Sequence, residues 1–325
     1  MNTLLDAIGN TPLVKLELSE NTPLFAKLEY LNPGGSVKDR LAKYLIEDAE
    51  LRGELKTGGT IIEASTGNQG VALAMIGAIK GYRVIITISE SISQEKRAAL
   101  KAFGAEVITC HATSSLLDPL SYHSVAKKIH AKTPNSFMPN QYFNTTNIIA
   151  HCKVTGPEIW KQTANKITHF FAAAGTGGTI SGIGKYLKEQ NPNIKIIAAD
   201  SNLSYRATNG NPKACEIEGM GINFDSPVPQ YDIIDELIEI TDSQAISILP
   251  HLAHNFGVLV GPSSGAVAYM TQQYAKKMKS TDVGIMLFAD SGRSYLSKGF
   301  YEKKSINDTA HVEPKKFSKI AQALV

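Results

Sequence analysis

A lysine beside a glycine turn is the most chemically suggestive feature of the sequence. In the stretch Asn-Pro-Gly-Gly-Ser-Val-Lys-Asp-Arg, residues 32–40, Gly34 and Gly35 permit a close backbone approach, and Lys38 stands where a helix is expected to begin. A lysine amine can act as a nucleophile or a base when its surroundings lower its pKa. Taken alone, this stretch is better explained as a surface lysine that begins a helix.

A second feature is the loop GTGGT, residues 175–179, which follows an apolar run and opens a helical pattern. Glycine N–H groups at a helix start favour an anion, and the hydroxyls of Thr176 and Thr179 can add donors. The pattern GxGxxG fails because Ile180 takes the place of its third glycine, and no lysine follows as in a P-loop. The loop therefore predicts a phosphate site without indicating a nucleotide; tight strand-to-helix packing is the alternative.

Three more turns follow apolar runs: STGNQG at residues 65–70, GPSSGA at 261–266 and DSGR at 290–293. The first offers hydroxyls, backbone N–H groups and a helix dipole, which suit a carboxylate. In isolation, Asn68 and the serines of the second turn are explained as simple helix N-caps. These turns become informative only together with Lys38 and the glycine loop.

Short β-rich segments alternate with helical patterns along the chain. We expect strands at residues 24–30, 60–63, 83–88, 106–109, 169–173, 195–200 and 283–289. Continuous apolar runs suit strands that are buried on both faces, and the alternation with helices predicts parallel sheets with right-handed crossovers. In one expected helix, Ser91 and Gln94 form a capping-box pattern and Gly104 stands at the C′ position.

Two such alternating series predict an α/β protein of two lobes with a cleft between them. One series covers about residues 36–145 and the other about residues 150–290. Ligands of open α/β folds bind beyond the carboxyl ends of the strands, where the turns described above are expected. The tail from Tyr301 onward is expected to form a peripheral helix or arm.

Composition limits the possible partners. The 325 residues carry 33 basic and 30 acidic side chains without long runs, which argues against a nucleic-acid surface or a polybasic membrane patch. Three distant cysteines fit neither a disulfide framework nor a CxxC metal site, so no metal is expected. The sequence shows neither a leader nor a membrane-spanning apolar run, and we therefore expect a cytoplasmic protein with small-molecule partners.

Five motifs, IGNTPLV (residues 8–14), NPGGSVKDR, STGNQG, GTGGT and GPSSGA, resemble in order and spacing those of the pyridoxal-phosphate enzymes of the cysteine synthase and cystathionine β-synthase group. The resemblance runs from about residue 4 to about residue 300. It implies two mostly parallel sheets flanked by helices, as in tryptophan synthase β, with pyridoxal 5'-phosphate in the cleft, and a homodimer. It also implies a smaller, mobile, substrate-closing domain at residues 36–145 and a larger cofactor-binding domain formed by residues 1–35 and 146–325. Segments such as PLSYHSVAKKI, with Glu216 and Glu218 before Gly219, are most similar to bacterial cystathionine β-synthases.

The resemblance also implies roles for individual residues. Lys38 would form the Schiff base with the cofactor and later move the substrate α-proton. The residues that would bind the cofactor are Lys38, Asn68, Gly175, Thr176, Gly177, Gly178, Thr179, Ser263 and Asp290. The residues that would bind the substrate are Ser65, Thr66, Gly67, Gln69, Gln141 and Gly219. Asn68 would bond the 3′-oxygen of the ring, and the neutral hydroxyl of Ser263 would face the ring nitrogen, which favours β-elimination.

The implied activity is β-replacement, condensing L-serine with L-homocysteine to L-cystathionine through an aminoacrylate that lobe closure shields from water. Cysteine synthase, which joins O-acetylserine or O-phosphoserine with sulfide, is the alternative, and a synthase joining phosphoserine to glutamate is a more distant one. Gln69 in place of a threonine, the inverted Ser65-Thr66 pair and Pro262 leave the substrate preference open.

A non-catalytic protein that docks a partner's peptide in the cleft is the alternative from another class, and Lys38 argues against it. A nucleotide-dependent enzyme is disfavoured by the two glycine patterns that fail. Some relatives carry a haem-binding amino-terminal extension and carboxyl-terminal regulatory modules, which we do not find in this sequence. We therefore expect neither haem nor control by an adenosyl ligand.

Overall fold

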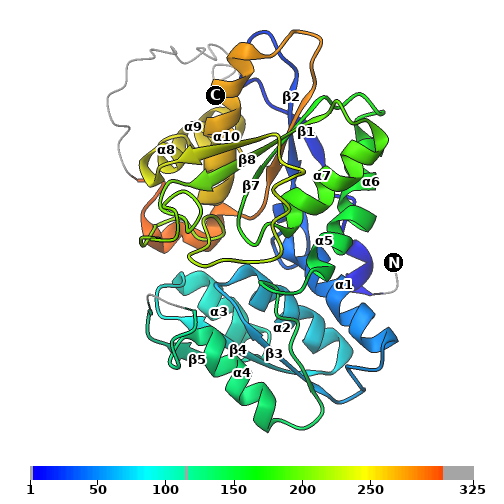
Figure 1. Ribbon diagram of the computed structural model, residues 1–325, viewed down its shortest axis with the longest axis vertical. Helices are drawn as coiled ribbons and strands as arrows, with labels where there is room; N and C mark the ends of the chain where they lie inside the picture. The colour runs from blue at the N-terminus through cyan, green and yellow to red at the C-terminus, as the bar shows by residue number, and fades with distance from the viewer. Residues whose placement is uncertain (1–2, 114–115, 303–325) are drawn as a thin grey trace, which may run out of the picture.

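The computed structural model describes residues 3–113 and 116–302, which fold into two lobes, each built on one sheet (Figure 1). The larger sheet has the order β1-β2-β10-β7-β8-β9, and the smaller has the order β5-β4-β3-β6. All strand pairs are parallel except β1 with β2. The predicted α/β class with two mostly parallel sheets is confirmed.

The strands of the larger sheet are β1 (Leu13–Lys15), β2 (Leu24–Leu28), β7 (His169–Ala173), β8 (Lys195–Ser201), β9 (Glu236–Ile240) and β10 (Gly284–Phe288). The smaller sheet contains β3 (Thr60–Ala64), β4 (Arg83–Ser89), β5 (Glu106–Cys110) and β6 (Ser136–Phe137). The predicted strands match seven of these to within two residues. The pattern missed β1 and β6 because they have only three and two residues, and β9 because its two glutamates mark a partly exposed edge strand.

The helices follow the strands in sequence. In the smaller lobe and at its border they are α1 (Lys38–Leu51), α2 (Asn68–Lys80), α3 (Gln94–Ala102) and α4 (Tyr122–Lys132). In the larger lobe they are α5 (Thr146–Ala150), α6 (Gly156–Gln162), α7 (Gly178–Gln190), α8 (Asp242–Ser247), α9 (Leu249–Phe256) and α10 (Pro262–Tyr274). Short turns complete the set: 3-10 helices η1 (Leu4–Ala7), η2 (Glu29–Leu31), η4 (Ala275–Lys277) and η5 (Gly292–Lys298), and a π-helix, η3 (His151–Thr155).

Helices cover both faces of the larger sheet, with α8, α9 and α10 on one side and α6 and α7 on the other (Figure 1). Strand β7 shows why its sequence is continuously apolar. Phe171 packs into the core beneath α10, whereas its neighbours Phe170 and Ala172 pack into the core beneath α7. A strand buried on both faces needs apolar residues at every position, as the sequence predicts.

Helix α1 lies at the border of the lobes. Its residues Ala42 and Ile46 join the core of the smaller lobe, and Leu41 and Leu45 pack against Ala150 of α5. The predicted domain limits therefore stay a prediction, and residues 303–325 of the predicted larger domain lie outside the described residues, as does nearly all of the predicted carboxyl-terminal arm. No helix in the described ranges is long and apolar enough to cross a membrane.

The predicted N-cap of α3, Ser91, is wrong. The helix begins after Ser93, whose hydroxyl accepts the N–H of Lys96, whereas the hydroxyl of Ser91 pairs with that of Ser89 at 2.9 Å. Two serines two residues apart compete for one cap, and the one whose backbone is extended beside the first turn takes it. Gly104 has a positive φ of 82° after the helix, in agreement with its predicted C′ role.

Candidate active site

Lys38 is the first residue of α1, directly after the glycine turn. Gly35 has a φ of 86°, and the N–H of Gly34 donates to the Asp39 carboxylate at 2.5 Å. The N–H of Val37 donates to the carbonyl of Ala289 at 2.8 Å, just beyond the end of β10. The turn therefore places Lys38 at the carboxyl edge of the larger sheet, where ligands of α/β folds bind.

The Lys38 amine lies near the predicted phosphate loop. Its Nζ is 3.5 Å from the Thr176 hydroxyl, although the two residues are far apart in the sequence. Desolvation lowers the pKa of Lys38 to about 8, and the Glu63 carboxylate opposes this shift only in part. An amine with this pKa is substantially neutral near pH 8, as a lysine that bonds an aldehyde or takes a proton requires.

Three positions of the loop at 175–179 have room for glycine only. A Cβ on Gly175 would collide with the carbonyl oxygen of Gly219, and one on Gly178 would collide with the Asn147 side chain. Gly177 has a φ of 84° as the N-cap of α7. These positions shape a cradle of backbone at a helix start, which fits a phosphate group.

The second predicted loop, residues 65–70, forms the start of α2. The Ser65 oxygen accepts N–H groups from Gly67 at 3.0 Å and Gly70 at 2.9 Å, so this side chain also holds the turn. Gln69 is buried, and neither polar atom of its amide has a hydrogen-bond partner within the described residues. Since a buried amide without a partner is costly, this one is consistent with a ligand that completes the site.

Asn68 of the smaller lobe contacts Asp290 of the larger lobe, and Ser263 lies near Gly219. The Asn68 amide donates to Asp290 Oδ2 at 2.8 Å, while Asp290 Oδ1 has no partner in the described part of the chain. Ser263 is buried near the start of α10, and a Cβ built on Gly219 would lie 3.8 Å from its hydroxyl. A hydrogen bond therefore joins two of the predicted residues across the lobes, with Asp290 directly supporting Asn68.

Three residues next to the site were not predicted to take part in it: Lys96, Glu218 and Tyr295. The buried Lys96 amine lies 2.8 Å from Glu218 Oε2 and 2.6 Å from the Tyr295 hydroxyl. A Cβ on Gly67 would collide with the Lys96 side chain, so this lysine also packs on the second loop. The sequence offers no warning, because a lysine in a Gln-Glu-Lys-Arg run looks like part of a solvated helix face.

Gln141 is buried, as a residue of the site should be, and its carbonyl accepts the Asn147 amide at 3.1 Å. The same Asn147 amide group donates to the Thr176 hydroxyl at 3.1 Å. Asn147 therefore connects the predicted carboxylate-binding segment with the phosphate loop. Its sequence context, Asn-Thr-Thr-Asn, reads as a polar linker and gave no sign of this.

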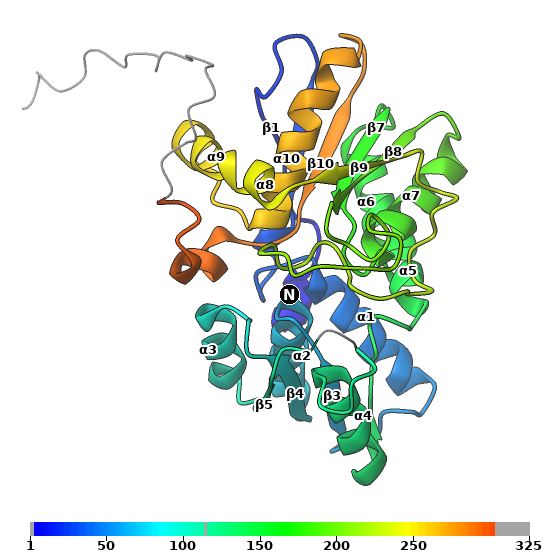
Figure 2. The ribbon, with the colours of Figure 1, turned by 60° about the vertical axis from the view of Figure 1, so that its left-hand side comes forward.

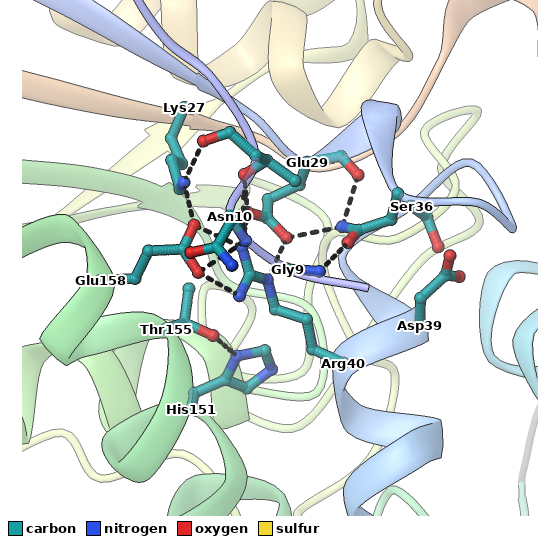
Figure 3. Close-up of polar contacts among 12 residues, drawn as sticks. Gly9, Asn10, Lys27, Glu29, Ser36, Asp39, Arg40, His151, Thr155 and Glu158 are labelled. Atoms are coloured by element: carbon teal, nitrogen blue, oxygen red, sulfur yellow. Dashed lines mark hydrogen bonds and ion pairs between the residues drawn. The ribbon is translucent and has the colours of Figure 1, made fainter. Parts of the chain in front are cut away.

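A buried network of charges surrounds Arg40, which follows Lys38 in α1 (Figure 3). The Arg40 guanidinium donates to both oxygens of Glu29, at 2.6 and 2.8 Å, and to Glu158 at 2.7 Å. Lys27 pairs with the same Glu158. Because Arg40 is two residues after Lys38, this network fixes the turn that carries the lysine.

The two-lobed α/β fold, Lys38 and the glycine loop at 175–179 together indicate a class of enzyme, and comparison with known proteins agrees with it. A family model described as pyridoxal-phosphate dependent enzyme matches residues 4–289, and the chain belongs to this family. The orphaned buried atoms of Gln69 and Asp290 and the glycine cradle fit this cofactor. No group of three or more metal-ligating side chains occurs in the described residues.

Individual relatives narrow the comparison. The chain is 42% identical over 310 residues to the cystathionine beta-synthase of Apis mellifera, covering 92% of this chain and 61% of that protein. It is 37% identical over 305 residues to a cysteine synthase of Staphylococcus aureus (strain N315), covering 93% and 97%. A crystal structure of an O-acetylserine dependent cystathionine beta-synthase from Helicobacter pylori matches with a TM-score of 0.86 and 36% identity, covering 93% and 99%. The chain thus spans slightly less than two thirds of the Apis mellifera protein.

Proposed function

We propose that the chain is a pyridoxal-phosphate dependent β-replacement enzyme that condenses L-serine with L-homocysteine to L-cystathionine. The observation that carries the β-replacement chemistry is the Lys38 amine, with its lowered pKa, 3.5 Å from the Thr176 hydroxyl of the glycine loop. The similarity to cystathionine beta-synthases from an animal and, in three dimensions, from a bacterium supports the choice of homocysteine as the acceptor.

The residues that would hold the cofactor are Lys38, Asn68, Gly175, Thr176, Gly177, Gly178, Thr179 and Ser263, with Asp290 behind Asn68. When bound, pyridoxal phosphate accepts the electron pair left behind when an amino acid loses its α-proton. The buried Ser263 hydroxyl presents no charge to the ring nitrogen. That neutrality suits elimination of a β-substituent better than chemistry that needs a long-lived carbanion.

Lys38 would take the α-proton of the donor amino acid. Its pKa of about 8 leaves a neutral fraction at neutral pH while keeping the ammonium acidic enough to return the proton. Ser65, Thr66, Gly67, Gln69 and Gln141 would bind the donor carboxylate at the start of α2, where backbone N–H groups and the helix dipole favour an anion. Gly219 would border the same space.

Closure of the smaller lobe would complete this site. Ser65 to Gln69 come from the smaller lobe and the phosphate loop comes from the larger one, so substrate binding bridges both. We assign the closing unit to residues 36–145 and the cofactor unit to residues 1–35 and 146–325. Closing the cleft would exclude water from the reacting centre.

Cysteine synthesis is the second candidate. The cysteine synthase of Staphylococcus aureus is covered over 97% of its length, whereas the cystathionine beta-synthase of Apis mellifera is covered over 61%. In this alternative the donor is O-acetylserine or O-phosphoserine and the acceptor is sulfide. All residue roles given above stay the same, because the two reactions differ in the leaving group and the incoming thiol.

Product analysis with paired substrates separates the two. The purified chain, supplied with pyridoxal phosphate, is incubated with serine or O-acetylserine, each with homocysteine or sulfide, and the initial rates are compared. We expect the highest kcat/KM for serine with homocysteine. Rapid cysteine formation from O-acetylserine and sulfide, with no cystathionine from serine, would establish the second candidate instead.

The assembly and location are also proposals. We propose a cytoplasmic homodimer that uses small amino acids and thiols, and that binds neither nucleic acid nor membranes. Sedimentation equilibrium of the purified chain tests the dimer: a mass of about twice the 35.1 kDa of one chain is expected, and a single-chain mass would contradict it.

A further inference from the structure

His151 is a buried histidine that touches the phosphate loop from behind. It is the first residue of the π-helix η3 and has no exposed surface. Its Nε2 lies 3.2 Å from the Thr179 hydroxyl, and its Nδ1 lies 2.9 Å from the Thr155 hydroxyl. Since Thr179 is the last residue of the glycine loop, a chain of three side chains leads from the larger lobe's interior into the proposed cofactor site.

Close packing of helices brings the imidazole to this position. A Cβ on Gly182 of α7 would lie 2.8 Å from the His151 Cβ and would collide with the Ile148 carbonyl oxygen. Only glycine at this point allows α7 and η3 to approach so closely. π-helical turns occur often at functional sites, where they redirect a side chain that an α-helix would place elsewhere.

The ring is neutral in this environment. Burial lowers the pKa of His151 well below its usual value, and the nearby cations Lys38 and Arg40 act in the same direction. A neutral imidazole has one N–H donor and one acceptor nitrogen. The two threonine hydroxyls can therefore be satisfied in only two ways, which differ in the nitrogen that carries the hydrogen.

We propose that His151 is a positioning residue whose Nε2–H donates to the Thr179 hydroxyl oxygen, so that the Thr179 hydrogen points to the cofactor phosphate. The Thr155 hydroxyl then donates to Nδ1. A phosphate dianion offers acceptors only, and a hydroxyl has a single hydrogen. In the opposite tautomer the Thr179 hydroxyl would donate its hydrogen to Nε2, and only an oxygen lone pair would face the phosphate.

The inference rests on the proposed placement of the phosphate at residues 175–179. Its test compares pyridoxal phosphate with pyridoxal, which lacks the phosphate, by fluorescence titration of the apo-enzyme. We expect His151→Leu to weaken pyridoxal phosphate binding about tenfold, the loss of roughly one hydrogen bond to a charged group, and to leave pyridoxal binding unchanged. His151→Gln can still present an N–H near the Nε2 position and should recover most of the lost affinity.

A matched control is His123→Leu. His123 is also buried, and its Nε2 lies 3.1 Å from the Asn140 side chain in the smaller lobe. This control should preserve the ratio of the two affinities. An equal loss for both ligands in His151→Leu, or no loss at all, would show that His151 only fills space and would overturn the inference.

Two further results separate the possible failures. If the wild-type protein bound pyridoxal as tightly as pyridoxal phosphate, the phosphate placement itself would fall, and the inference with it. If the wild type preferred pyridoxal phosphate and His151→Leu kept that preference, only the inference would fall. Nitrogen-15 NMR of histidine-labelled wild-type holoenzyme needs no variant: a protonated Nε2 on His151 is expected, and a protonated Nδ1 would contradict the proposal.

Discussion

Two buried charge clusters support the proposed site, and they connect different parts of the chain. The Arg40 cluster (Lys27, Glu29, Arg40 and Glu158) joins β2, η2, α1 and α6 through several short hydrogen bonds (Figure 3). The Lys96 cluster (Lys96, Glu218, Asp290 and Tyr295) joins α3 of the smaller lobe to loops of the larger lobe, and η5 lies directly above α3 in Figure 2. The first cluster fixes the turn that carries Lys38, whereas the second depends on how the lobes are spaced.

This difference in connection matches two requirements of the proposed mechanism. A lysine that must reach a bound aldehyde needs a rigidly held backbone, and bidentate buried ion pairs can hold it. A cleft that opens and closes needs contacts that can be remade, and a single amine among two carboxylates and a phenol can do this. The Lys96 amine lies 3.8 Å from Asp290 and 2.8 Å from Glu218, a looser arrangement than the fork at Arg40.

Breaking the Arg40 cluster should have the largest effect on stability. In Arg40→Met the buried Glu29 and the largely buried Glu158 lose their shared partner, and removing one member of a buried pair typically costs about 3–5 kcal/mol. Urea denaturation of the variant and the wild type measures this difference. Arg83→Met is the control, because its partner Glu106 and Arg83 itself are about half exposed, and its loss should stay below about 1 kcal/mol. Equal effects of the two variants would contradict the comparison.

Acid should weaken the same cluster. Burial raises the pKa of Glu158, but hydrogen bonds and charge from Arg40 and Lys27 outweigh it and lower this pKa to about 2. The ionised carboxylate therefore stabilises the fold fully above its ordinary pKa of about 4.5, and this contribution, about 3 kcal/mol, is lost as the pH falls toward 2. The stability gap between the wild type and Glu158→Gln should narrow over that interval. A gap that stayed constant down to pH 2 would show that Glu158 is not ionised by its partners.

Lys96→Met probes the cluster between the lobes. We expect a smaller loss of stability than for Arg40→Met, about 1–2 kcal/mol, together with a fall of about tenfold in kcat/KM for the donor amino acid, because closure loses its central contact. Denaturation and steady-state kinetics measure the two effects. Lys101→Met changes an exposed lysine of the same helix and should alter neither. An unchanged kcat/KM in Lys96→Met would show that this cluster does not contribute to the proposed closure of the lobes.

The smallest effect on stability is expected for the exposed contact between α3 and η5, at the edge of the Lys96 cluster. Glu95 accepts the N–H and the hydroxyl of Ser297 at 2.7 and 2.8 Å, which links α3 to η5 at an exposed position. Glu95→Gln should cost no more than about 0.5–1 kcal/mol in urea denaturation, because exposed charged contacts contribute little. A loss of stability as large as that of Lys96→Met would show that the exposed Glu95–Ser297 contact stabilises the fold as much as the buried Lys96 amine does.

Local patterns predicted the strands and the loops of the site, because each depends on neighbouring residues. Apolar runs marked β4 and β10, and the glycines around Lys38 and Thr176 marked turns that only glycine can form. The order of the motifs then implied the family. The cap of α3 was misplaced because the sequence offers two serines, and only the backbone path selects Ser93.

The supporting residues could not be predicted in the same way. Lys96, Asn147 and His151 acquire their roles from partners more than a hundred residues away or from another helix, as with Lys96 and Glu218. Nothing in the local sequence distinguishes a buried lysine or histidine from an exposed one, because burial is a property of the assembled fold. Residues of the site were predictable from the sequence only where they belong to one of the motifs.

The central claim is that Lys38 is the residue to which the cofactor attaches. It is tested most directly by treating the protein with pyridoxal phosphate, reducing it with borohydride, and mapping the modified peptide by mass spectrometry. The account predicts a single stoichiometric adduct on Lys38 and none in Lys38→Ala. Modification of another buried lysine, such as Lys96 or Lys27, or no stoichiometric adduct at all, would contradict it.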